Sequence, residues 1–387
     1  MKILILLNSI RVSGTEKLMF ELSRKFSLMG DDVYLSPLIT PFDLRFKESV
    51  EHDDSTFDIL FPEFIERFDW LFWKFNGLTV FLFGWSVRSF ILQNFISKKC
   101  KEIGIELIVS NSYPTDMFVI PVFQKTNIPY VIVDHGSYCY FLEEDTPFSK
   151  RALDYASAIV GVSKWTVGKL KQILPNRKIT LIYNGYIELS RGNDFTFRKA
   201  LETTDYFVFC MHGRGSKQKG WDLAIEAFKI VKSKGYKIKL LLLTEGSYIN
   251  ELKTKYDNEE NLIFGGFVYN LADVFEFVDV GLVLSRKYEA FGLSVLDYFG
   301  EGIPVIGSNL GGLNEVVHCE GQVGGLLVNL DNNGTPVLKE IVDKMVELMN
   351  EEGVYNDLSA GAKRISEYYS IKKCSEAYSK LFQSIHN

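Results

Sequence analysis

The stretch that decides the fold is Ser285–Val317, SRKYEAFGLSVLDYFGEGIPVIGSNLGGLNEVV. A short apolar run, Val280–Leu284, precedes it and is typical of a buried strand. A polar loop then leads into Leu293–Phe299, where apolar residues recur at helical spacing. Two glycines end this helix, and a β-branched run from Pro304 starts another strand. This alternation predicts a parallel α/β sheet.

The start of the predicted helix is the place where a ligand is expected. Gly292 opens the helix, and Leu293, Leu296 and Phe299 share the face that we expect to be buried. In parallel units, ligands bind beyond the carboxyl ends of the strands, where helix N-termini offer free N–H groups to anions. Glu289 lies just before this helix. A carboxylate repels a phosphate, so its presence indicates a polyhydroxylated group beside the anion, such as a sugar attached to a phosphate.

The stretch resembles the signature of the family 4 retaining glycosyltransferases, which use nucleotide sugars and have two Rossmann-like domains (the GT-B type). The family pattern is Glu, seven residues, Glu, followed by Gly-x-Pro-Val and a Gly-Gly-x-x-Glu turn. Here Glu289 is the first carboxylate and Asp297 occupies the second position, with Gly302–Val305 and Gly311–Glu315 following in order. Asp in place of Glu at 297 keeps the charge but shortens the reach by one methylene.

The resemblance implies an α/β GT-B fold with two Rossmann-like domains facing across a cleft. The C-terminal helix is expected to cross back to the first domain. We therefore expect an acceptor domain over residues 1–188 together with residues 367–387. The donor domain is expected over residues 189–366.

A second family feature is Gly-Arg, four residues, Lys-Gly, found here at Arg214 and Lys219. Two cations beside a helix N-terminus form a strong pyrophosphate site. The resemblance implies that Arg214 and Lys219 bind the donor diphosphate, that Glu289 holds sugar hydroxyls and that Asp297 holds the ribose. The loop residues Phe291, Gly292 and Leu293 complete the predicted donor site.

Two further site residues are expected in the first domain. Gly14 follows the first apolar run, Ile3–Leu7, and would let the backbone approach the donor phosphate. His135 follows the apolar run Pro129–Val133 and precedes a glycine. It resembles the family histidine that lies near the transferred sugar, so His135 and Glu289 are the predicted catalytic residues. No metal ligand or cofactor is predicted, and the sequence contains no Asp-x-Asp triplet.

Composition limits the other classes of function. The 387 residues suit two domains, and the net charge of −6 argues against nucleic acid as a partner. The five cysteines show neither C-x-x-C nor zinc-ligand spacing, which favours a reduced cytoplasmic protein. The N-terminal MKILILLNSI is interpreted as a first buried strand and not as a signal peptide.

The region before residue 100 leaves membrane contact open. Leu78–Ile96 is strongly apolar, but Phe83, Val87, Phe90 and Ile91 recur at helical spacing, which favours a core-facing helix over a membrane span. The preceding segment, Phe57–Phe75, is dense in aromatic residues. These suit either core packing or a surface that touches the inner face of the cell membrane or a lipid-linked acceptor.

The predicted function is transfer of a sugar from a nucleoside diphosphate sugar to a glycan or lipid-linked acceptor, with an α-glycosidic bond. The resemblance suggests bacterial surface polysaccharide synthesis, such as capsule or lipopolysaccharide. A glycosidase is disfavoured because Glu289 and Asp297 stand before and within one helix, and a dehydrogenase because G-x-G-x-x-G is missing after the first strand. A nucleotide-sugar 2-epimerase of the same fold and a non-catalytic sugar-nucleotide-binding subunit remain as alternatives.

Overall fold

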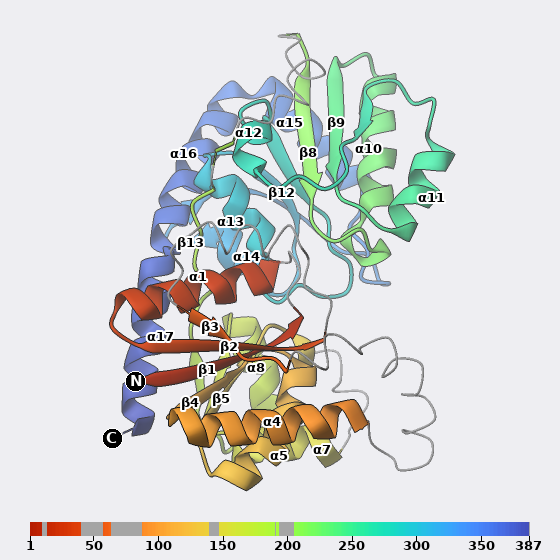
Figure 1. The fold of residues 1–387 in the computed structure, drawn as a ribbon. Coiled ribbons are helices and arrows are strands. Elements are labelled where there is room, and N and C mark those ends of the chain that lie inside the picture. The colour runs from red at the N-terminus through yellow and green to blue at the C-terminus, as the bar shows by residue number, and fades with distance from the viewer. Residues whose placement is uncertain are drawn as a thin grey trace. The chain divides into compact units, whose positions relative to one another are not determined.

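The computed structural model describes residues 1–9, 14–39, 57–62, 87–138, 147–189, 191–192 and 205–386 (Figure 1). The chain divides into two compact units, Met1–Gly185 with Ile371–Asn387, and Tyr186–Ser370. The predicted boundaries at 188/189 and 366/367 lie within a few residues of this division. Residues from Ile371 onward belong to the first unit, so the expected return of the C-terminal helix is confirmed.

The first unit is built on a seven-stranded sheet with the order β3-β2-β1-β4-β5-β6-β7. All its neighbouring strands pair in parallel. The side chains of Ile3–Leu7 in the central strand are fully buried, as the unbroken apolar run predicts for a strand covered on both faces. The strands are β1 (Lys2–Ser9), β2 (Asp32–Ile39), β3 (Phe57–Ile59), β4 (Leu107–Ser110), β5 (Tyr130–Asp134), β6 (Ala158–Gly161) and β7 (Ile179–Leu181).

Helices connect these strands, and the last helix of the chain packs beside the first (Figure 1). The ring of Phe26 lies 5.4 Å from Phe382 and 6.4 Å from Tyr378, and all three side chains are buried. This aromatic contact fastens the C-terminal helix to the first unit. The helices are α1 (Gly14–Leu28), α4 (Val87–Ile103), α5 (Tyr113–Thr126), α7 (Pro147–Tyr155), α8 (Lys164–Ile173) and α17 (Ile371–His386).

The buried face of α4 differs from the predicted one. Phe90 is 46% exposed, with the Lys125 ammonium 5.3 Å from its ring centre, whereas Leu92, Ile96 and Cys100 are buried. These three residues follow one another at four-residue spacing along a helix that continues to Ile103. The predicted segment ended at Ile96. Of the residues predicted to face the core, Ile91 is partly buried and packs against it, whereas Phe90 is exposed, so the predicted face is correct only in part.

The second unit is built on a six-stranded sheet with the order β10-β9-β8-β11-β12-β15, also parallel throughout. A short antiparallel pair accompanies it. The six strands are β8 (Phe207–His212), β9 (Ile238–Leu243), β10 (Leu262–Phe264), β11 (Val280–Val283), β12 (Val305–Ser308) and β15 (Gly325–Val328). The pair is β13 (His318–Cys319) with β14 (Gln322–Val323).

In the second unit, α13 buries two of the three residues predicted for its apolar face, Leu296 and Phe299. In α13 the first residue, Leu293, is half-buried and shares the accessible side with Ser294 and Asp297, while the residues around them are buried. The predicted burial of Leu293 is therefore wrong, because the helix starts at the carboxyl edge of the sheet. The helices are α10 (Trp221–Ser233), α11 (Ser247–Lys255), α12 (Leu271–Phe275), α13 (Leu293–Gly300), α14 (Leu313–Val317), α15 (Leu338–Asn350) and α16 (Glu352–Tyr368), with a 3-10 turn at Lys217–Lys219.

Three further sequence predictions concern a membrane span, the cysteines and the aromatic segment. Within the described ranges, no helix combines the length and the apolar character needed to cross a membrane. Four of the five cysteines are described, and all four are free and buried. The fifth, Cys139, lies outside the described residues, as do residues 78–86 and most of the aromatic segment Phe57–Phe75.

Candidate functional site

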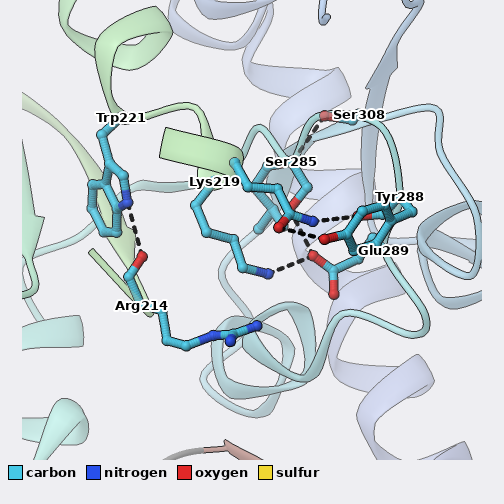
Figure 2. A network of polar contacts seen from close by, with 9 residues as sticks. Arg214, Lys219, Trp221, Ser285, Tyr288, Glu289 and Ser308 are labelled. Atoms are coloured by element: carbon cyan, nitrogen blue, oxygen red, sulfur yellow. Dashed lines mark hydrogen bonds and ion pairs between the residues drawn. The ribbon is translucent and has the colours of Figure 1, made fainter. Parts of the chain in front are cut away.

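The centre of the candidate site is an ion pair between Lys219 and Glu289. Lys219 ends the 3-10 turn that follows β8, and Glu289 lies in the loop that follows β11, the neighbouring strand of the sheet. Lys219 Nζ lies 2.6 Å from Glu289 Oε2, and the Ser285 hydroxyl donates to the same oxygen at 2.6 Å (Figure 2). Two residues 70 positions apart in the sequence are thus joined because their strands are adjacent.

Glu289 is ionised at neutral pH despite its burial. Desolvation opposes its charge, but Lys219, the Ser285 hydroxyl and Arg214 together hold the pKa of this carboxyl below its usual value. A charged carboxylate accepts hydrogen bonds without donating any. Glu289 is therefore suited to bind hydroxyl groups.

Arg214 is placed by the residue that opens α10. The fully buried Trp221 donates from its indole Nε1 to the Arg214 carbonyl at 3.0 Å. The side chains of Arg214 and Lys219 both extend toward Glu289 (Figure 2). The structure thus brings together the three predicted residues Arg214, Lys219 and Glu289 at the carboxyl edge of the second sheet.

The paired glycines of the signature let two loops pack together. The Gly312 N–H donates to the Glu289 carbonyl at 2.9 Å, and a Cβ on Gly311 would lie 2.2 Å from the same oxygen. Gly292, at the N-cap of α13, has a φ of 95°, which side chains rarely allow. Phe291 beside it is buried. These residues hold the backbone around Glu289 in place.

The second predicted carboxylate has different surroundings. Asp297 lies on the accessible side of α13, and its Oδ2 is 3.6 Å from His212 Nε2. The His212 ring is itself fixed by Tyr298 at 4.9 Å and Phe275 at 5.5 Å between ring centres. Sequence reasoning missed His212, although its position at the end of β8, directly before a glycine, was a usable signal.

The remaining predicted residues, Gly14 and His135, belong to the first unit. Gly14 is exposed and is the first residue of α1. His135 directly follows β5, and its Nε2 is buried with no hydrogen-bond partner among the described residues. Burial lowers the pKa of His135 to about 4, so its ring is neutral at pH 7.

A buried acidic group beside His135 was not predicted. Asp134 Oδ1 accepts backbone N–H groups of Gly136 at 2.9 Å and Tyr138 at 3.3 Å, which fixes the turn that carries His135. Asp116, expected in a loop, lies in the first turn of α5, where it accepts from Ser110 at 2.6 Å and from the Tyr138 hydroxyl at 2.9 Å. Desolvation raises the pKa of Asp116 to about 8 and that of Asp134 to about 6.

Metal binding has no candidate among the residues that the structure describes. No three of their His, Cys, Asp and Glu side chains are grouped so that they could hold an ion.

Two parallel sheets with helices, each with polar groups at its carboxyl edge, define an α/β protein of the GT-B class. The model of glycosyltransferase family 4 matches residues 12–187, and that of glycosyl transferases group 1 matches residues 193–365. The two models together span most of the chain. The protein therefore belongs to the family 4 glycosyltransferases.

Known proteins support this assignment. An uncharacterized glycosyltransferase of Methanocaldococcus jannaschii is 25% identical over 81% of this chain and 82% of its own. The lipopolysaccharide core biosynthesis mannosyltransferase LpsB of Rhizobium meliloti is 26% identical over 62% of this chain and 69% of its own. The crystal structure of Anabaena HepE in complex with UDP-glucose has a TM-score of 0.76 at 18% identity, over 99% of this chain and 100% of that chain. The last comparison shows a shared fold.

Proposed function

We propose that the protein is a retaining glycosyltransferase that moves a sugar from a nucleoside diphosphate sugar to an acceptor with an α-glycosidic bond. The observation that carries the proposal is the ionised Glu289 held between Lys219 and Arg214. Cations alone would suit a phosphate, and a carboxylate alone would suit hydroxyls. The combination suits a ligand that has both, such as a sugar diphosphate. The UDP-glucose bound to Anabaena HepE, which shares this fold, supports the proposal.

Each residue has a distinct task in this proposal. Negative charge grows on the leaving diphosphate as its bond to the sugar breaks. Arg214 and Lys219, with the N–H groups at the start of α13, stabilise that charge where a metal ion does so in other enzymes. Glu289 accepts hydrogen bonds from the sugar hydroxyls, and Asp297 accepts them from the ribose. No side chain is assigned as a covalent nucleophile.

His135 completes the proposed catalytic set. Its neutral ring and unpartnered Nε2 suit a hydrogen bond to a sugar hydroxyl, and Asp134 holds the turn on which the ring stands. Gly14 is assigned to the approach of the donor phosphate.

The acceptor is proposed to be a glycan or a lipid-linked oligosaccharide of a bacterial surface polysaccharide. The lipopolysaccharide role in the name of LpsB supports this class of acceptor. The site of action is then the cytoplasm or the inner face of the cell membrane.

The decisive experiment is incubation of the purified protein with a panel of nucleotide sugars, with and without glycan acceptors. Release of nucleoside diphosphate that rises with acceptor, and an α-linked product from an α-linked donor by NMR, are the expected results. A β-linked product would contradict retention. An isomerised nucleotide sugar without acceptor would identify an epimerase, and binding without any reaction would identify a binding subunit. Unchanged transfer in excess EDTA is expected if no metal is required.

Membrane contact can be tested separately. Lys98, Lys99 and Lys101 lie on the exposed side of α4, where the first two approach Glu102 at 3.6 and 3.0 Å. Each lysine near an anionic surface contributes about 1 kcal/mol, reduced by salt. We expect partial co-sedimentation with anionic vesicles at low salt and release at high salt. No sedimentation at low salt would contradict membrane contact.

A further inference from the structure

A third cation, Arg286, stands in the loop that carries Glu289 but engages other partners. Its guanidinium Nη2 lies 2.7 Å from Asp222 Oδ2, in the first turn of α10. Its Nη1 donates to the Lys217 carbonyl at 3.1 Å. Only 15% of the Arg286 side chain is exposed. Two of the guanidinium nitrogens are thus occupied by protein groups.

The same loop is joined to the 3-10 turn by three further hydrogen bonds, all at Gln218. The Arg286 N–H donates to the Gln218 carbonyl at 2.8 Å. The Tyr288 hydroxyl donates to Gln218 Oε1 at 2.7 Å, and Gln218 Nε2 donates to the Tyr288 carbonyl at 3.3 Å. Tyr288 directly precedes Glu289, and Gln218 directly precedes Lys219. These contacts therefore set the spacing of the two charged residues.

The spacing matters most when a ligand is bound. In the structure, Lys219 and Glu289 satisfy each other. If the proposed function holds, a diphosphate competes for Lys219 and the sugar hydroxyls compete for Glu289, so their ion pair loosens. A separate set of contacts is then needed to keep the two loops, and with them Lys219 and Glu289, at the same spacing. Misplacement of catalytic groups by about 1 Å can cost on the order of 100-fold in rate.

We propose that Arg286 and Asp222, with Gln218 and Tyr288, form a loop clamp that positions Lys219 and Glu289 for the sugar diphosphate, and that Arg286 is not a phosphate ligand. This inference rests on the proposed function for its effect on catalysis. The contacts of the loop clamp exist without any ligand. Tyr248, in the first turn of α11, is a further neighbour of Asp222. Burial first, and then the neighbouring Asp222 carboxylate, raise the pKa of the Tyr248 hydroxyl to about 12.

The test compares Arg286→Ala, Arg286→Lys, Asp222→Asn and the double variant Arg286→Ala/Asp222→Asn. Lys287→Gln is the control, because it removes a neighbouring cation whose side chain is exposed. Three quantities are measured for each protein. These are kcat/KM for transfer, the affinity for UDP and GDP by calorimetry, and hydrogen exchange at the backbone amide of residue 286 without ligand.

If the loop clamp has a positioning role, removing either partner of the Arg286–Asp222 ion pair should lower kcat/KM to a similar extent. Arg286→Ala and Asp222→Asn should each lower kcat/KM by about tenfold to 100-fold, and the double variant should be no worse than the poorer single one. Arg286→Lys should lose kcat/KM to a similar extent, because lysine keeps the positive charge but lacks the guanidinium group with its two terminal nitrogens. The amide of residue 286 should exchange faster in all four proteins, and Lys287→Gln should behave as the unaltered protein.

Two results would overturn the inference. Weaker diphosphate binding in Arg286→Ala with unchanged binding and turnover in Asp222→Asn would make Arg286 a phosphate ligand. Unchanged kcat/KM and unchanged hydrogen exchange at residue 286 in both single variants would show that the loop clamp has no positioning role. If the unaltered protein neither binds diphosphate nor transfers sugar, the proposed function fails. Exchange at residue 286 then decides whether Asp222 holds the loop.

Discussion

Glu289 of the second unit and Asp116 of the first are both buried carboxyl groups close to the carboxyl edge of a parallel sheet, but their partners differ. Glu289 has the Lys219 ammonium at 2.6 Å, and its pKa lies below the usual value. The Asp116 carboxyl is hydrogen-bonded to the hydroxyls of Ser110 and Tyr138, and desolvation raises its pKa to about 8. One carboxyl group is charged at pH 7 and the other holds its proton.

The difference shows that burial alone does not decide the charge of a carboxyl group. Desolvation raises the pKa of both residues, and at Glu289 the cations Lys219 and Arg214, together with the Ser285 hydroxyl, reverse this effect. The second unit therefore presents a charged edge that can bind an anion and its attached hydroxyls. In the first unit, Asp134 holds the turn that carries His135, and the protonated Asp116 is hydrogen-bonded to the Tyr138 hydroxyl next to that turn. Similar folds thus support two different kinds of site.

The largest expected effect comes from removing the charge of Glu289. Glu289→Gln should lower turnover by on the order of 100-fold or more without unfolding the protein, because a charge-specific contact in the site is lost. Transfer kinetics with a thermal melting control measure this. Glu259→Gln is the matched variant, since Glu259 pairs with Lys232 at 2.8 Å next to the start of β10, the other end of the strands. Near-normal transfer by folded Glu289→Gln protein would show that Glu289 is not a residue of the active site.

The cations beside Glu289 come next. Arg214→Ala and Lys219→Ala should each weaken nucleoside diphosphate binding by roughly 1.5–3 kcal/mol, the usual value of a hydrogen bond to a charged group. Titration calorimetry with UDP and GDP measures the loss, and Lys232→Ala serves as the control. If both variants bind diphosphate as tightly as the unaltered protein, the two residues are surface charges.

The protonated state of Asp116 predicts a pH-dependent stability. The folded protein keeps this proton up to about pH 8, whereas the unfolded chain loses it near 3.8, so stability falls as pH rises between these values. Between pH 6 and 8, Asp116 contributes a slope of up to about 1.4 kcal/mol per pH unit, and Asp134, with a pKa of about 6, adds to it mainly at the lower end of this range. Asp116→Asn should flatten this slope in urea denaturation. The same slope in both proteins would contradict the prediction.

Glu289 provides a second test, because its contribution to stability changes with pH in the opposite direction. Its lowered pKa contributes stability that is present above pH 4.5 and is lost as pH falls below that value. Glu289→Gln should therefore leave the slope between pH 6 and 8 unchanged.

The smallest expected effect concerns His135. A neutral hydrogen bond contributes about 0.5–1.5 kcal/mol, so His135→Ala should lower kcat by about two- to tenfold. Because its pKa is about 4, turnover should show no titration of His135 between pH 6 and 8. Diphosphate affinity should stay the same, since the cations lie in the second unit. The exposed His318→Ala is the control. An inflection near pH 6.5 that disappears in His135→Ala would show that the ring is charged during turnover.

Local patterns were enough to predict the elements that build the sheets. The predicted strand Val280–Leu284 corresponds to β11, Val280–Val283, and the helix opened by Gly292 was also predicted. Runs of apolar residues and glycine boundaries carry this information within a few positions. The family resemblance added the residue set of the donor site, which remains to be tested by experiment.

The tertiary structure alone decided which polar groups meet and which protons they keep. Lys219 pairs with Glu289 across 70 positions and Arg286 with Asp222 across 64, because the loops that follow neighbouring strands lie together at one edge of the sheet. The sequence also did not predict that Phe90 is exposed or that Asp116 keeps its proton. Burial and charge depend on what the rest of the chain places around a residue, and local spacing does not contain that information.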